Sequence, residues 1–140
     1  MANDNLVLDR AKRPLSVWLI CLGNGLMAII LIATGFLAEA RGYSSALAAV
    51  YGFTGLAMSV AAHATWYGNR FGRLALLVLV TLYFGNLVGY SVWAIAQAPD
   101  EPLFYDDVVT GALLRIGLSL VWLALNYILL FQQRARMFFA

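Results

Sequence analysis

Four long runs of apolar residues follow one another along the chain, separated by short polar segments. The runs are residues 15–38, 45–67, 74–96 and 108–131. About 20 apolar residues are enough for a helix to cross the hydrocarbon core of a bilayer. Backbone polar groups in lipid must bond within their own segment, which favours helices over open strands. The pattern predicts an all-α polytopic membrane protein, a single domain over residues 1–140 with four transmembrane helices.

The polar segments between the runs are too short for long crossover connections. Consecutive helices should therefore be antiparallel neighbours, which predicts an up-down four-helix bundle. Pro14 precedes the first run and suits the start of a helix. Asp106 or Asp107 is predicted to cap the fourth helix, where a negative charge next to the N-terminus is favourable.

Basic residues gather on one side of the predicted membrane. They are Arg10, Lys12, Arg13, Arg70, Arg73, Arg134 and Arg136. The first and third loops hold only Arg41, together with acidic residues. Because loops rich in Lys and Arg remain in the cytoplasm, both termini are predicted to be cytoplasmic. We expect an integral protein of the bacterial cytoplasmic (inner) membrane.

Composition narrows the functional classes. Hydrophobic residues make up 63% of the chain and charged residues 11%, against about 25% charged residues in a soluble domain. The lipid bilayer is therefore the first expected partner. The net charge of +2 lies at the ends of the runs, so no nucleic-acid partner is expected. One cysteine (Cys21) and one histidine (His63) cannot build a metal site or ligate a haem from both sides. No catalytic set of residues is recognisable, so we expect neither an enzyme nor a cofactor.

The fourth run carries polar residues at helical spacing. Gly111, Arg115, Ser119, Trp122 and Asn126 are three or four residues apart and share one helix face. Arg115 is the only charged residue deep inside any run. Polar groups that face hydrocarbon are costly, so this stripe is expected to face protein or a wet cavity.

Three interpretations of Arg115 remain open. Its side chain can extend outward to the membrane surface, pair with an acidic residue of a partner protein, or bind an anion or a lipid headgroup. No Asp or Glu lies within the runs. An internal ion pair would therefore need Asp106, Asp107 or Glu39 to reach in.

Two asparagines, Asn24 and Asn86, lie near the middle of their runs, and each follows a glycine. Amides in lipid need hydrogen-bond partners. One interpretation is a clamp in which they bond each other or Ser59 and Ser119. The other is a polar path for an ion or a small solute.

The second run has small residues along one face, including Gly52, Gly55 and Ser59. Small residues at this spacing allow close approach of two helix backbones. This face is expected to pack either within the chain or against a second copy of it.

Two functions fit these features. The first is an accessory or interaction subunit of a larger membrane assembly, which binds a membrane-protein partner through helix faces. The second is a self-associating small channel or transporter. In it, Arg115, Asn24, Asn86 and Ser119 would line an anion-preferring path.

Overall fold

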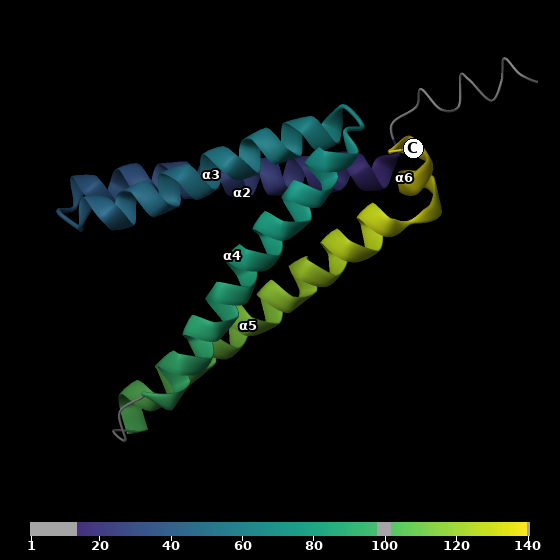
Figure 1. The fold of residues 1–140 in the computed structure, drawn as a ribbon. Coiled ribbons are helices and arrows are strands. Elements are labelled where there is room, and N and C mark those ends of the chain that lie inside the picture. The colour runs from purple at the N-terminus through teal and green to yellow at the C-terminus, as the bar shows by residue number, and fades with distance from the viewer. Residues whose placement is uncertain (1–13, 98–101, 140) are drawn as a thin grey trace, which may run out of the picture. The chain divides into compact units, whose positions relative to one another are not determined.

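The computed structural model describes residues 14–97 and 102–139 of the chain. The helices are α2 (Leu15–Ala40), α3 (Ser45–Trp66), α4 (Arg70–Ala96), α5 (Pro102–Phe131) and the short α6 (Gln133–Phe138) (Figure 1). The described residues contain no strand. Four of the helices are long and apolar enough to cross a membrane. The prediction of an all-α protein with four such helices is therefore confirmed. Several charged residues of the sequence argument lie outside the described residues: Arg10, Lys12, Arg13, Asp100 and Glu101.

The fourth long helix begins earlier than predicted. α5 starts at Pro102, so Asp106 and Asp107 lie inside the helix and neither caps it. The predicted cap is therefore wrong. Proline has the backbone φ angle that the first helical position requires, and it favours a start at residue 102. The two carboxylates still lie near the positive end of the helix dipole.

The third long helix also begins earlier, at Arg70 rather than residue 74. The Asn69 side chain caps it. Its Oδ1 accepts hydrogen bonds from the backbone N–H groups of Phe71 at 2.8 Å and Gly72 at 3.2 Å. The predicted basic loop is consequently shorter, and Arg70 and Arg73 lie on the first turn of α4.

The chain divides into two compact units. The first contains α2, α3, the start of α4 to Leu79, the end of α5 from Ile128, and α6. The second contains the rest of α4 and α5, residues 80–127.

Within the first unit, α2 and α3 pack with their backbones in close contact. A Cβ atom added to Gly55 of α3 would lie 2.7 Å from the Ala28 carbonyl oxygen. A Cβ atom added to Gly35 of α2 would lie 2.8 Å from the Ala48 carbonyl oxygen. Most of the buried residues of α2 recur every three or four positions: Val17, Cys21, Asn24, Ala28, Leu31, Gly35 and Ala38. This spacing is typical of helices that cross at a shallow angle.

The second unit is a pair of antiparallel helices that lie side by side (Figure 1). Buried residues that repeat every seven positions follow each helix, and we call the contact between them the seam. They are Phe84 and Ser91 on α4, and Ala112, Ser119 and Asn126 on α5, and Val80 of α4 is buried as well. A seven-residue repeat is typical of helices that wind gently around each other.

Candidate functional site

The seam of the second unit contains the most concentrated polar groups of α4 and α5. Ser91, Ser119 and Asn126 are each no more than 1% exposed. The Asn126 side-chain amide donates to the Trp122 carbonyl oxygen at 2.9 Å, one turn earlier on α5. The buried Ser91 hydroxyl has no hydrogen-bond partner among the described residues. Small polar side chains here allow the two helices to approach closely.

A hydrogen bond joins the two helices on one side of this seam. The hydroxyl oxygens of Thr81 and Tyr127 lie 2.9 Å apart. Each helix turns by about 100° per residue. Counted from the buried stripes, Arg115 falls about 50° from the contact on the side opposite this hydrogen bond, whereas Asn86 falls about 150° from it, on the face of α4 turned away from α5. Along the helix axes their depths differ by roughly 10 Å, at 1.5 Å per residue.

Asn86 and Arg115 are both exposed. The predicted stripe on α5 is therefore rotated relative to the observed contact. Ser119 and Asn126 lie in the seam, Trp122 and Gly111 are half-buried, and Arg115 lies outside it. Sequence spacing alone located the polar side of α5 to within about a quarter of a turn.

Asn24 belongs to the first unit and is fully buried. Its side-chain amide donates to the Ile20 carbonyl oxygen at 3.0 Å, one turn earlier on its own helix. Asn24 and Asn86 lie in different units, so their predicted clamp stays a prediction.

The small residues of α3 differ in their surroundings. Gly55 is buried against Ala28 and Ile32 of α2, whereas a Cβ atom on Gly52 would meet nothing within 4 Å. Ser59 is half-buried and lines a hollow of about 560 Å³ between α2 and α3. Cys21 and His63 line the same hollow. No group of three or more His, Cys, Asp or Glu residues gathers among the described residues.

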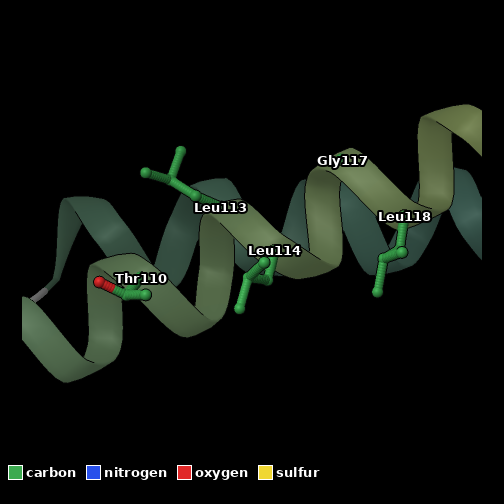
Figure 2. A pocket seen from close by; sticks show the side chains of 5 residues that line it. All are labelled: Thr110, Leu113, Leu114, Gly117 and Leu118. Atoms are coloured by element: carbon green, nitrogen blue, oxygen red, sulfur yellow. The ribbon is translucent and has the colours of Figure 1, made fainter.

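The outer face of α5 is almost entirely apolar. Figure 2 shows a hollow whose lining side chains all come from this one helix. The residues are Thr110, Leu113, Leu114, Gly117 and Leu118. Leucines of this kind are well suited to contact lipid tails.

Sequence reasoning missed one feature, a group of arginine and phenylalanine side chains at the end of the first unit. The guanidinium carbon of Arg73 lies 5.0 Å from the centre of the Phe139 ring and 5.2 Å from that of Phe131. Arg136 lies over the same Phe131 ring at 5.7 Å. The available signal was the short distance in sequence between the arginines and the phenylalanines near the C-terminus. The helical turn of α6, which positions Arg136 and Phe139, gave no clear periodic pattern.

No protein-family model matches the chain, and neither a curated protein nor a solved structure shows a significant similarity to it. Its function therefore has to be inferred from its own residues.

Proposed function

We propose that this chain is an accessory subunit of a membrane assembly. It binds another membrane protein through the faces of the α4–α5 pair that expose Asn86 and Arg115. Arg115 offers a positive charge and Asn86 an amide, and both are exposed within membrane-length helices. They are therefore suited to bind a partner helix that carries an acidic residue.

The exposure of Arg115 supports this proposal most directly. Arg115 lies nine residues after Asp106, about 14 Å further along the helix at 1.5 Å per residue. An arginine near the centre of a membrane helix costs about 2.5–3.5 kcal/mol on insertion scales. The runs of this chain contain no acidic residue to offset that cost. A carboxylate on a partner helix would offset it through a two-pronged hydrogen-bonded pair.

Asn86 adds a second exposed polar contact, on the face of α4 turned away from α5. It is exposed near the middle of α4, and Gly85 and Gly89 flank it with nothing within 4 Å of an added Cβ atom at either position. The glycines leave room for a partner backbone, and the amide offers two donors and one acceptor.

The same proposal includes an up-down topology with both termini in the cytoplasm of a bacterial cell, and insertion in its cytoplasmic membrane. Its support is the bias of the positive charges. Arg70, Arg73 and Arg136 belong to one end of the first unit, where Phe138 of α6 lies against Gly68. The positive-inside bias assigns this end to the cytoplasm.

The test is purification of the tagged chain from its native membrane in a mild detergent. Arg115→Leu should leave the isolated protein folded and at least as stable, because it removes an exposed charge. Recovery of a stoichiometric partner should fall by tenfold or more, since stranding the partner's buried charge costs about 3–5 kcal/mol. Asn86→Leu should weaken recovery less, and Leu118→Ala on the apolar face of α5 is the matched control.

Two results would contradict the proposal. One is a loss of stability of the isolated protein on Arg115→Leu, which would mean that the same chain already covers the arginine. The other is a pure homo-oligomer that holds no second protein and is unchanged by Arg115→Leu.

A further inference from the structure

The end of the first unit holds a built group of charged and aromatic side chains. We call Arg73, Arg136, Phe131 and Phe139 the basic–aromatic cluster. Arg73 is half-buried on the first turn of α4, Phe131 ends α5, and the other two residues belong to the C-terminal segment. Both guanidinium groups lie within cation–π distance of the Phe131 ring.

Neighbouring backbone contacts hold the cluster in place. A Cβ atom on Gly72 would lie 2.6 Å from the Ala64 side chain, so the first turn of α4 is tightly packed on the end of α3. Gly68 has a φ angle of +78°, and the Phe138 ring lies 3.3 Å from its Cβ position. The connection between α3 and α4 therefore turns at a glycine, and α6 lies against it.

The described segments around the cluster carry no counter-charge. No Asp or Glu occurs between Glu39 and Asp100, and none follows Asp107. The described residues of α3, the start of α4, the end of α5 and α6 therefore bring no carboxylate side chain to this end of the unit, and Asp4 and Asp9 lie outside the described residues. Two arginines around one aromatic ring repel each other, and a bound anion would attract both and offset that repulsion.

Arg73 itself is incompletely satisfied. Its Nε atom is buried and has no hydrogen-bond partner among the described residues. Aromatic rings contact the flat face of a guanidinium group, whereas its N–H donors lie in the plane. The stacking on Phe131 and Phe139 occupies the flat face of the group, so a planar or tetrahedral anion would bind in its plane, through the terminal N–H donors rather than the buried Nε.

The position of the cluster indicates which anion is available. Trp66 and Tyr67 end α3 next to it, and Phe131 ends a membrane-length helix. Aromatic residues at helix ends are typical of the headgroup level of a bilayer. Phosphate is the anion that is abundant at this level, and arginine binds it through two parallel hydrogen bonds.

We propose that Arg73 and Arg136 form a binding site for a phosphate group, of the kind that an anionic phospholipid presents at the membrane surface. Arg73 supplies the two-pronged contact, and the exposed Arg136 closes on the phosphate from α6. The rings of Phe131 and Phe139 hold the guanidinium plane of Arg73 in position. The residues of this site belong to the first unit, whereas Asn86 and Arg115 belong to the second, and the site does not depend on the proposed function.

The experiment titrates phosphatidylglycerol into the full-length protein in mild detergent and counts bound lipids by native mass spectrometry. Diacylglycerol with the same acyl chains lacks the phosphate and is the blank. Arg73→Gln and Arg136→Gln should each weaken phosphatidylglycerol binding by about fivefold. Arg70→Gln is the matched control, because Arg70 is exposed on the same turn and stacks on Phe71 instead, at 5.3 Å. It should change the affinity by less than about twofold.

A second arm separates the two sources of phosphate. Inorganic phosphate is added at millimolar concentration to the protein with its lipid bound. Displacement of the lipid would identify the free ion as a competent ligand, whereas retention would identify the lipid headgroup.

Arg73→Lys carries the test if Arg73→Gln fails to fold. Lysine keeps the charge and loses the planar fork, so binding should weaken although the net charge is unchanged. Equal weakening by Arg70→Gln and Arg73→Gln would overturn the proposal, because it would reduce the effect to general surface charge. Binding of diacylglycerol as tight as that of phosphatidylglycerol would overturn it as well.

Discussion

Individual glycines set the distance between α2 and α3. Gly55 leaves no space for a methyl group, since an added Cβ atom would lie 2.7 Å from the Ala28 carbonyl oxygen and from the Ile32 side chain. Gly52, one turn earlier on the same helix, has nothing within 4 Å of that position. Gly52 and Gly55 belong to the same face of small residues in the sequence. A larger side chain nevertheless fits at Gly52 and not at Gly55.

Gly55→Ala should destabilise the protein by about 1–3 kcal/mol, because a well-packed contact must open to admit the methyl group. Gly52→Ala should be neutral or stabilising by up to about 1 kcal/mol, since alanine is the better helix former. Unfolding in mixed micelles of mild and denaturing detergent, followed by circular dichroism, measures both. Equal effects of the two substitutions would show that Gly55 does not limit the approach of the helices.

At the scale of elements, α4 and α5 form a pair that is held together by few large side chains. Small residues in the seam and the hydrogen bond between Thr81 and Tyr127 fix its register. Lipid offers no hydrophobic driving force between helices, so packing and hydrogen bonds must supply it.

Thr81→Val and Tyr127→Phe each remove one hydroxyl of this bond. A double-mutant cycle should give a coupling energy of about 0.6 kcal/mol, and no more than about 1.7 kcal/mol. Thr34→Val is the control for Thr81→Val, because the Thr34 hydroxyl donates to the Ile30 carbonyl oxygen within its own helix. Its effect should add to that of Tyr127→Phe. Additivity of Thr81→Val and Tyr127→Phe would show that the two hydroxyls do not interact in the membrane.

At the scale of the whole molecule, the distribution of charge predicts the orientation in the membrane. Arg70, Arg73 and Arg136 lie at one end of the first unit, and the turn with Glu39 and Arg41 ends the α2–α3 hairpin at its other end. A few charged side chains at the membrane edges therefore account for the energy difference between the orientation with this end inside the cell and the reverse orientation.

The orientation is tested by labelling single cysteines in intact cells after Cys21→Ser. Tyr67→Cys and Gln133→Cys should be protected from an impermeant thiol reagent, and Tyr43→Cys and Gln97→Cys should be labelled. All four residues are exposed, so permeabilised cells should label every variant. Labelling of Tyr67→Cys from outside would reverse the proposed topology.

The apolar pattern by itself determined that the chain is helical and has four membrane-length helices. A run of apolar residues in lipid has a single way to satisfy its backbone within the segment, so length and composition are sufficient for that prediction. The sequence also shows directly that the apolar runs contain no acidic residue, because composition can be counted without any knowledge of contacts.

Only the tertiary structure decided which side of each helix is covered. A shift of one residue rotates a helix by about 100°, and the apolar residues surround α5 on most sides. The sequence pattern therefore could not separate Ser119, which is buried in the seam, from Arg115, which is exposed. Nor could it bring Arg73 next to Phe131 and Phe139, since residues 58 and 66 positions apart meet only through the packing of the helices. The spans follow from the free energy of transfer into lipid, whereas the sites follow from rotations that only side-chain packing determines.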